Sequence, residues 1–380
     1  SGTSDIHIEC FRDFAQVRMR RDGSMEVIEV YSKYLFKHYA GVITRFKILA
    51  DCDISERRLP QDGAITIKDP MGGKDDIDFR FNIMPTKNGE RIVMRILAGN
   101  PALSLDKLGF DPDDYNKIID AINAPQGMVL VTGPTGSGKT TTLYGALQEI
   151  NKPDTCILTA EDPVEYYLEG AGQVQANEKI GLTFSSILRS FLRQDPEVIL
   201  VGEIRDQETI DIAIKAALTG HLLLSTLHTN DAPSAITRLT ELGIPPYLIR
   251  ATVIGVMAQR LVRTLCNECK TPIDIQEEDW KMLTRPWNTP LPKQAHQAVG
   301  CIACRNTGYR GRAGVYEIMP LSDNLKDHIN EQGQLTELRK QAIKEGMYSL
   351  RLSGANKVAK GQTTIEEVLR VTPSSLSSQS

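Results

Sequence analysis

Residues 133–140 read GPTGSGKT and match the phosphate-binding pattern G-x-x-x-x-G-K-[S/T]. The apolar run Met128 to Thr132 precedes this stretch, and a helix is expected after it, from Leu143 to Ile150. In such a unit the glycines let backbone N–H groups surround phosphates, and the helix N-terminus favours negative charge. The sequence therefore predicts a nucleotide-binding P-loop, with an ordinary Gly-rich turn as the alternative.

The side chains of this loop have separate predicted roles. Lys139 is expected to reach the β- and γ-phosphates of ATP, and the hydroxyl of Thr140 is expected to bind Mg²⁺. The residues expected to contact the nucleotide are Gly133, Pro134, Thr135, Gly136, Ser137, Gly138, Lys139, Thr140 and Thr141.

Three further apolar runs end in ionisable residues, which are Glu203, Glu161 and His228. Because ligands of open α/β sheets bind at the carboxyl ends of the strands, these residues are candidates for catalysis. Glu203 is expected to orient the attacking water or to hold Mg²⁺ through water, with Glu161 as the rival. A solvated loop carboxylate is the alternative for each acid, and a structural histidine is the alternative for His228.

The scaffold for these residues is predicted over residues 108–263, where short apolar strands alternate with helices. This pattern is typical of a parallel sheet that is covered on both faces. The expected strands are Met128 to Thr132, Cys156 to Ala160, Val198 to Val201 and Leu222 to Thr226, and the expected helices include Phe184 to Gln194 and Gln207 to Leu218.

Residues 264–312 form a polar, Pro-rich insertion that contains two Cys-x-x-Cys pairs. The members of the pairs are Cys266, Cys269, Cys301 and Cys304. Four thiolates suit tetrahedral Zn²⁺ and leave no position open for substrate, so we expect a zinc site that staples the insertion. A redox pair or unliganded thiols are the alternatives. A helical region is expected over residues 313–372, followed by a disordered tail over residues 373–380.

The N-terminal residues 1–97 are predicted to form a small α+β domain, joined to the rest by a linker over residues 98–107. Alternation along two of its strands places Arg80, Arg91 and Arg95 on the face opposite the apolar residues. Solvated surface arginines are the ordinary interpretation of such a pattern.

Composition restricts the class of protein. The chain has 380 residues, 41% hydrophobic residues and a net charge of −4, so it lacks the basic excess of a general nucleic-acid binder. No apolar run is long enough to span a bilayer, and the N-terminus has no signal-peptide pattern, so a cytosolic or peripheral location is expected. Because the sequence begins within a predicted strand, we also expect that an upstream region is missing.

The ordered motifs resemble those of the secretion ATPase superfamily. The P-loop is followed by an acidic box at 161–165, a Walker B strand ending at Glu203 and a histidine box at 220–229. Three segments of the first domain, 4–9, 60–63 and 89–91, also resemble type II secretion and type IV pilus assembly ATPases. The four-cysteine insertion is similar to that of the assembly and secretion members and argues against the retraction ATPases.

This resemblance implies an α/β fold in which a RecA-like P-loop domain follows a PAS-like α+β domain. It implies a homohexamer at the cytoplasmic face of the bacterial inner membrane that hydrolyses ATP to assemble a type IV pilus or a type II secretion pseudopilus. The implied partners are an inner-membrane platform protein and, through the missing N-terminal region, a membrane-associated docking protein. Arg80 and Arg95 would lie over the nucleotide, and Arg91, which shares their face, is the alternative candidate for this role.

Two other functions stay open at this point. A DNA-transport or DNA-uptake ATPase would handle nucleic acid indirectly, and no direct nucleic-acid contact is expected from the weak negative charge. A non-hydrolysing, nucleotide-gated scaffold would use the cysteine insertion as its interaction surface. Glu203 and the acidic box favour hydrolysis.

Overall fold

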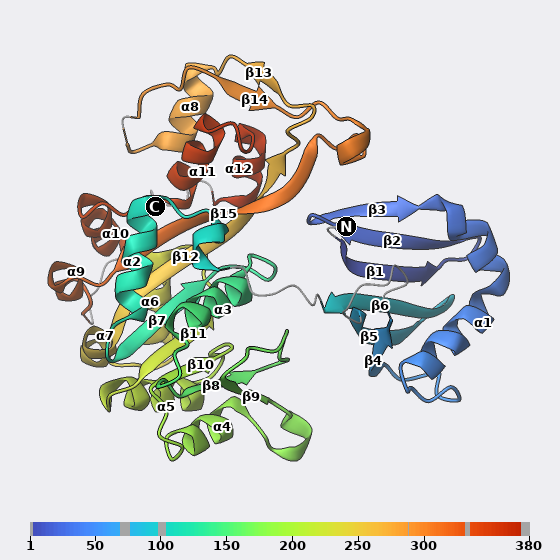
Figure 1. Ribbon diagram of the computed structural model, residues 1–380, viewed down its shortest axis with the longest axis horizontal. Coiled ribbons are helices and arrows are strands. Elements are labelled where there is room, and N and C mark those ends of the chain that lie inside the picture. The colour runs from blue at the N-terminus through green and yellow to red at the C-terminus, as the bar shows by residue number, and fades with distance from the viewer. Residues whose placement is uncertain (1–2, 69–76, 98–103, 288, 331–334, 374–380) are drawn as a thin grey trace. The chain divides into compact units, whose positions relative to one another are not determined.

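The computed structural model describes residues 3–68, 77–97, 104–287, 289–330 and 335–373. The chain divides into two compact units, Ser1–Pro101 and Ala102–Ser380, each of which is described by itself (Figure 1). Of the predicted linker, residues 98–103 lie outside the described residues, as do residues 374–380 of the predicted tail.

The first unit is a six-stranded antiparallel sheet in the order β3-β2-β1-β6-β5-β4. Its elements are β1 (Thr3–Cys10), β2 (Ala15–Arg21), β3 (Ser24–Ile28), η1 (Glu29–Tyr31), α1 (Ser32–Leu49), β4 (Gln61–Ile67), β5 (Ile77–Thr86) and β6 (Gly89–Leu97). Leu35 and Ile43 of α1 form one apolar cluster with Phe81 and Ile83 of β5 and Ile92 of β6. Because strand side chains alternate, the polar residues of the same strands face away from this cluster.

The second unit is built on a seven-stranded sheet in the order β15-β12-β7-β11-β10-β8-β9. The strands are β7 (Gly127–Thr132), β8 (Ile157–Glu161), β9 (Ala171–Gln175), β10 (Val198–Val201), β11 (Leu222–Leu227), β12 (Val253–Leu265) and β15 (Tyr309–Pro320). Neighbouring strands pair in parallel except for β15, which runs antiparallel to β12.

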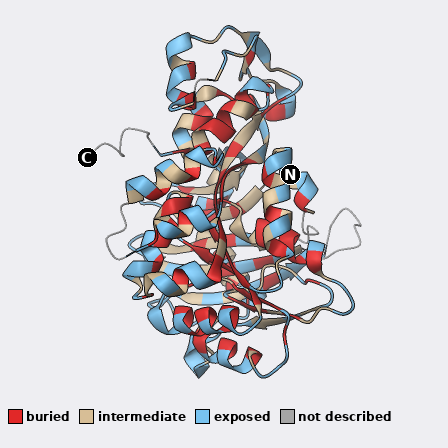
Figure 2. Ribbon diagram, turned by 90° about the vertical axis from the view of Figure 1, so that its left-hand side faces the viewer, coloured by how far each residue is buried: buried red, intermediate tan, exposed pale blue. Residues whose placement is uncertain are grey.

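Helices cover both faces of this sheet, as Figure 2 shows by the buried central strands and the part-exposed helices around them. Val129 and Val131 of β7 pack with α2 and α3, whereas Met128 and Leu130 pack on the other face with α4 to α7, α10, α11 and α12. The helices are α2 (Pro112–Ile122), α3 (Lys139–Ile150), α4 (Phe184–Phe191), α5 (Gln207–Leu218), α6 (Ala232–Glu241), α7 (Pro246–Thr252), α8 (Glu277–Thr284), α9 (Asp323–Asp327), α10 (Leu335–Lys344), α11 (Leu350–Ala359) and α12 (Ile365–Val371). The predicted α/β class, with a largely parallel sheet between two helical layers, is confirmed.

Strands β12 and β15 correct the predicted organisation after residue 263. They pair from Gly255 opposite Pro320 to Leu265 opposite Tyr309, so residues 313–320 continue the sheet and do not belong to a helical region. The sequence obscured β12 because Gln259 and Arg260 interrupt its apolar run, although both side chains are buried. The cysteine insertion is thus an excursion between two directly paired strands.

The segment that begins the second unit is fixed by the C-terminal part of the chain. The hydroxyl of Tyr316 donates to the carbonyl of Leu108 at 2.9 Å, and the Nζ of Lys357 donates to the carbonyl of Gly109 at 2.8 Å. Lys360 also pairs with Asp111 at 2.6 Å. The described end of the predicted linker, residues 104–107, leads into a short 3₁₀ helix, η2 (Leu105–Leu108), which these contacts hold.

Candidate functional site

The predicted P-loop connects β7 to α3, and its glycines have a steric reason. Gly133 has φ 152° and Gly138 has φ 88°. Residues other than glycine rarely adopt such positive φ angles. A Cβ at Gly133 would lie 2.6 Å from the backbone oxygen of Gln259, and one at Gly138 would lie 2.9 Å from the Nε2 of Gln259. The backbone of the loop therefore passes directly against β12.

Gln259 supports this loop and was missed in the sequence. Its Nε2 donates to the carbonyl of Ser137 at 2.8 Å, and its Oε1 accepts from the hydroxyl of Thr142 at 2.8 Å. The side chain is 2% exposed, so both amide groups need protein partners. The only signal in the sequence was an amide within an otherwise apolar run.

Lys139 is the first residue of α3 and turns back over its own loop. Its Nζ donates to the carbonyls of Gly133 at 2.9 Å and Pro134 at 3.2 Å. Burial lowers the pKa of Lys139, while the nearby carboxylate of Glu203 acts in the opposite direction. Because β7, β11 and β10 are neighbouring parallel strands, the predicted lysine and the predicted acid follow strand ends at the same edge of the sheet.

Glu203 lies just beyond the end of β10 and contacts two basic side chains. Its Oε2 lies 3.3 Å from the Nε2 of His228, which follows β11, and its Oε1 pairs with Arg205. Parallel pairing of β10 with β11 brings these strand ends together. The structure thus groups Glu203 with His228, as their common position predicted, and adds Arg205, which the sequence analysis did not select.

Glu161 ends β8 but has a different environment. It is 3% exposed, and its carboxylate accepts from the hydroxyls of Tyr144 and Thr159, the latter at 2.5 Å, and from the Nε2 of Gln173 at 3.2 Å. Burial and these contacts with Glu161 raise the pKa of Tyr144. The carboxylate of Glu161 therefore joins α3 to β8 and β9 within the structure.

The arginines of the first unit share the polar face of its sheet with carboxylates. Arg80 lies opposite Arg95 across β5 and β6, and Arg95 lies opposite Asp5 of β1. The Nε of Arg95 pairs with Asp5 at 2.9 Å, and Arg91 pairs with Glu9 at 3.1 Å. Burial would raise the pKa of Asp5, but hydrogen bonds from Ser4 and Arg95 outweigh it and lower that pKa. Arg80 and Arg95 are exposed, whereas Arg91 is half-buried.

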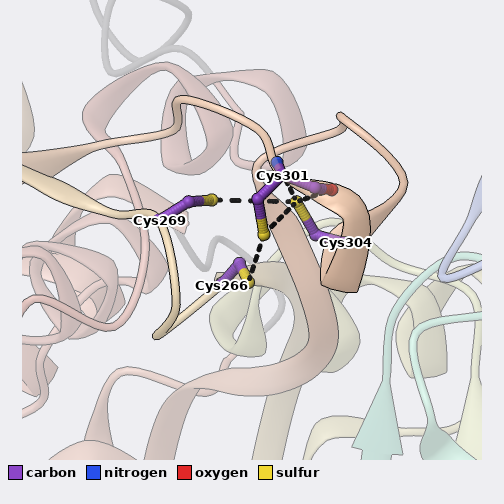
Figure 3. Close-up of side chains that lie close together, drawn as sticks. All are labelled: Cys266, Cys269, Cys301 and Cys304. Carbon is purple, nitrogen blue, oxygen red and sulfur yellow. Dashed lines mark hydrogen bonds between the residues drawn. The ribbon is translucent and has the colours of Figure 1, made fainter.

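The four predicted cysteines come together at the base of the insertion. Their Sγ atoms all lie within 4.8 Å of one another, and the side chains point toward a common centre (Figure 3). Cys266 and Cys301 are 3.9 Å apart, and Cys269 and Cys304 are 3.7 Å apart. Sulfurs at about 2.3 Å from one tetrahedral ion would be about 3.8 Å apart, so the set can hold a metal ion.

Backbone amides also favour the thiolate form in this cluster. The Sγ of Cys304 accepts from the amides of Cys301 at 3.1 Å and Gly308 at 3.2 Å. Burial raises the pKa of Cys304, but these amides and the neighbouring thiols of Cys269 and Cys301 outweigh it and lower the pKa to about 6. Burial and the thiol contacts within the cluster raise the pKa of Cys269 to about 11. The Sγ of Cys269 accepts from the amide of Gly300 at 3.3 Å. A thiolate is the form of cysteine that binds metal ions.

The remainder of the insertion packs on the C-terminal helices. β13 (Thr271–Ile273) pairs with β14 (Ala295–Gln297), and Trp280 and Leu283 of α8 are buried in the cluster that includes α11 and α12. Figure 1 shows α8, β13 and β14 together at one end of the second unit, beside these helices. Metal binding at the cysteines would fix the two ends of this excursion.

Among the residues that the structure describes, no helix has the length and apolar character that crossing a membrane requires.

Comparison with known proteins gives a match over almost the whole chain. Residues 1–370 match the family model described as "Type II/IV secretion system protein". The type IV pilus assembly ATPase PilB of Myxococcus xanthus is 50% identical over 368 residues, which are 96% of this chain and 64% of that protein. The type II secretion system protein E of Pseudomonas aeruginosa is 46% identical over 373 residues, which are 97% of this chain and 72% of that protein. The chain thus spans about two thirds of the length of these relatives.

A solved structure supports the fold. The ATPase DotB of Legionella pneumophila superimposes with a TM-score of 0.70 at 20% identity, covering 97% of this chain and 91% of that one. At this level of identity the likeness concerns the fold alone.

Proposed function

This chain belongs to the family of type II/IV secretion system proteins, and we propose that it hydrolyses ATP to power assembly of a type IV pilus or of a type II secretion pseudopilus. Two relatives support both alternatives by their names, a pilus assembly ATPase and a type II secretion protein. One observation carries the proposal, which is that the P-loop, His228 and Glu203 follow the carboxyl ends of the neighbouring parallel strands β7, β11 and β10, with His228 3.3 Å from Glu203.

In the proposed reaction, the N–H groups of residues 135–140 and the ammonium of Lys139 hold the phosphates of ATP. The phosphates replace the loop carbonyls that Lys139 contacts in this structure. Thr140 would hold Mg²⁺, which supplies positive charge to the phosphate oxygens when bound. Glu203 orients a water for attack on the γ-phosphorus and accepts its proton, as the bond from that phosphorus to the β-phosphate oxygen breaks.

Glu203 is preferred to Glu161 as the residue that orients the water. Its two structural contacts are with exposed basic side chains that solvent and ligand can reach, Arg205 and His228. Glu161, in contrast, is buried and its oxygens already accept hydrogen bonds from Tyr144, Thr159 and Gln173. We therefore assign Glu203 to hydrolysis and Glu161 to the packing of α3 against β8.

The cysteine cluster is proposed to bind one Zn²⁺. Four sulfur ligands with tetrahedral spacing are typical of a structural zinc site that has no free coordination position. The proposed role is to hold residues 266–308 against the β12–β15 pair.

The proposed assembly is a homohexamer at the cytoplasmic face of the bacterial inner membrane, where it would act on a platform protein of that membrane. A docking protein associated with the membrane is the second proposed partner. These proposals rest on the resemblance of the motifs to secretion ATPases and on membership of the family, whose relatives are named for pilus assembly and secretion.

Arg80 and Arg95 are proposed to neutralise phosphate charge during transfer. A guanidinium binds phosphate oxygens in a planar, bidentate manner and carries its charge at any working pH. The exposure of both side chains leaves their guanidinium groups accessible to an anion. Arg95 pairs with Asp5 but stays exposed. Arg91, in contrast, is half-buried and contacts both Glu9 and His7, so it is less suited.

Lys139→Ala is expected to lower ATP turnover by at least about 100-fold, because a positioned charge on the transferring phosphoryl group is lost. Phosphate release by purified, folded protein is the measurement. Lys152→Ala is the matched control, because this exposed lysine follows the other end of α3. Turnover by Lys139→Ala at the level of the control would refute ATP hydrolysis at this site.

Glu203→Gln is expected to keep ATP binding while turnover falls by about 100-fold or more, since the amide cannot accept the proton. Glu161→Gln should instead lower the thermal midpoint of unfolding, because one amide cannot accept all the present hydrogen bonds. Nucleotide titration, phosphate release and thermal melting on both variants separate the two roles. The opposite pattern would move the catalytic assignment to Glu161.

Purified protein is expected to contain one Zn²⁺ per chain, measured by elemental analysis. Cys301→Ser should lose the metal. Residues 266–308 should then become more sensitive to protease, because the metal ion no longer holds the two ends of the insertion together. Cys156→Ser, outside the cluster, should retain the metal. Absence of zinc from protein prepared without chelator, or equal protease sensitivity of the two variants, would contradict this proposal.

Arg80→Ala and Arg95→Ala are each expected to lower turnover by about 10-fold or more, with a much smaller effect on ATP affinity. Lys68→Ala should have little effect on either. Because Arg95→Ala also removes a partner of Asp5, Arg18→Ala serves as the second control, since it removes a partner of Glu9 on the same sheet. Near-normal turnover in both test variants would leave Arg80 and Arg95 as solvated surface residues.

A further inference from the structure

Glu317 of β15 is a buried carboxylate that the proposed reaction does not use. It is 5% exposed, and its two oxygens accept backbone N–H groups from different helices. Oε1 accepts from Ala232 at 2.8 Å, and Oε2 accepts from Leu350 at 3.4 Å. Ala232 is the first residue of α6 and Leu350 is the first residue of α11. One side chain therefore joins the N-termini of two helices.

This arrangement satisfies amides that the helices cannot pair internally. The first N–H groups of a helix have no partner within the helix, and they carry partial positive charge. The capping side chains of Asp231 and Ser349 serve Ser234 and Leu352, respectively, so they do not occupy the amides of Ala232 and Leu350. Glu317 supplies the acceptor for both of these remaining amides.

The N-terminus of α6 continues directly from the loop that carries His228. Within this loop the amide of Thr229 donates to the hydroxyl of Thr132 at 2.8 Å, at the end of β7 where the P-loop begins. Arg260 of β12 donates to the carbonyl of Asn230 at 3.0 Å. Glu317 then holds Ala232, so the loop is fixed at both of its ends and in its middle.

Charged groups from three elements surround this carboxylate. Asp231 of the loop is paired with Arg339 of α10 at 2.8 Å. Burial lowers the pKa of Arg260 of β12, and the charge of Glu317 acts in the opposite direction. Burial and the charge of Asp231 raise the pKa of Glu317 to about 7, while the amide of Ala232 and Arg339 act in the opposite direction. Burial of Glu317 thus disfavours its charged form. The hydrogen bonds that it accepts from the two helices offset part of the free-energy cost of burying a carboxylate.

We propose that Glu317 is a positioning residue for phosphoryl transfer, which ties α6 to α11 and thereby holds His228 beside Glu203. The inference rests on the proposed function of the same site. His228 contacts Glu203 at 3.3 Å, and only residues 229–231 separate it from the amide that Glu317 accepts. A shift of the α6 N-terminus therefore moves the histidine relative to the acid.

The test uses Glu317→Ala and Glu317→Gln in the full chain. The alanine variant loses both acceptors, and the glutamine variant retains one carbonyl acceptor with nearly the same shape. We expect kcat to fall by about 10-fold or more in Glu317→Ala and by less in Glu317→Gln, while KM for ATP changes by about twofold at most. The P-loop, which does not contact Glu317 directly, should continue to bind nucleotide.

Glu367→Gln is the matched control. Glu367 is another buried carboxylate of this unit, 1% exposed, and it joins α12 to Arg263 of β12 without contacting the loop of His228. Its substitution should lower stability but leave kcat per folded molecule unchanged. An equal loss of kcat in Glu367→Gln, or unchanged kcat in both Glu317 variants, would overturn the proposal. If Glu317→Ala does not fold, Glu317→Gln decides alone.

Amide hydrogen exchange gives a readout that does not depend on ATP hydrolysis. We expect Glu317→Gln to increase exchange over residues 228–236 and at the start of α11, with little change in α5. A uniform increase through α5 would indicate general destabilisation and refute positioning. If the unsubstituted protein fails to hydrolyse ATP while this local pattern is present, the proposed function fails and the role of Glu317 in fixing the loop stands.

Discussion

The edge of the sheet that carries the P-loop depends on the side chain of Gln259, which lies beneath this loop. A phosphate-binding loop must leave its own N–H groups unpaired, so it cannot be held by the ordinary ladder of a helix or strand. Gln259 holds it from below through Ser137 and Thr142, and the close approach of β12 is possible because Gly133 and Gly138 carry no Cβ. An unpaired amide at such a buried position would cost about 1–3 kcal/mol, so the glutamine and the glycines are required together.

Sequence patterns predicted the central strands because each is a short, continuous apolar run, and such runs occur where both faces of a sheet are covered. β7, β10 and β11 have this form, and the P-loop and His228 follow from their ends. β12 is also an interior strand of this sheet, but it contains Gln259 and Arg260. The polar groups of these two residues form hydrogen bonds with residues that are distant in the sequence. Such long-range partners cannot be inferred from local periodicity, which is why β12 and its pairing with β15 were missed.

The two acids at strand ends show the same limit of local reasoning at the candidate site. Glu161 and Glu203 both follow apolar runs, so the sequence ranked them together. Glu161 is still within β8, and its side chain lies on the face that α3 covers, where Tyr144 and Thr159 donate to it. Glu203 lies two residues beyond the end of β10, where it contacts Arg205 and His228. A difference of two residues in the position relative to a strand end therefore separates the buried carboxylate of Glu161 from the part-exposed carboxylate of Glu203.

β15 contacts both the segment that begins the second unit and the loop of His228, because its successive side chains point to opposite faces of the sheet. Tyr316 reaches the carbonyl of Leu108, in the segment that begins the second unit, while Glu317 reaches the N-terminus of α6 behind His228. Helix α11 contacts both, since Leu350 donates to Glu317, Ser353 accepts from the amide of Tyr316, and Lys357 holds the carbonyl of Gly109. The first residue of α11 is thus attached to Glu317, and its last turn is attached to the segment that begins the unit. The loop that carries His228 and the start of this unit are thus linked by direct contacts through β15 and α11.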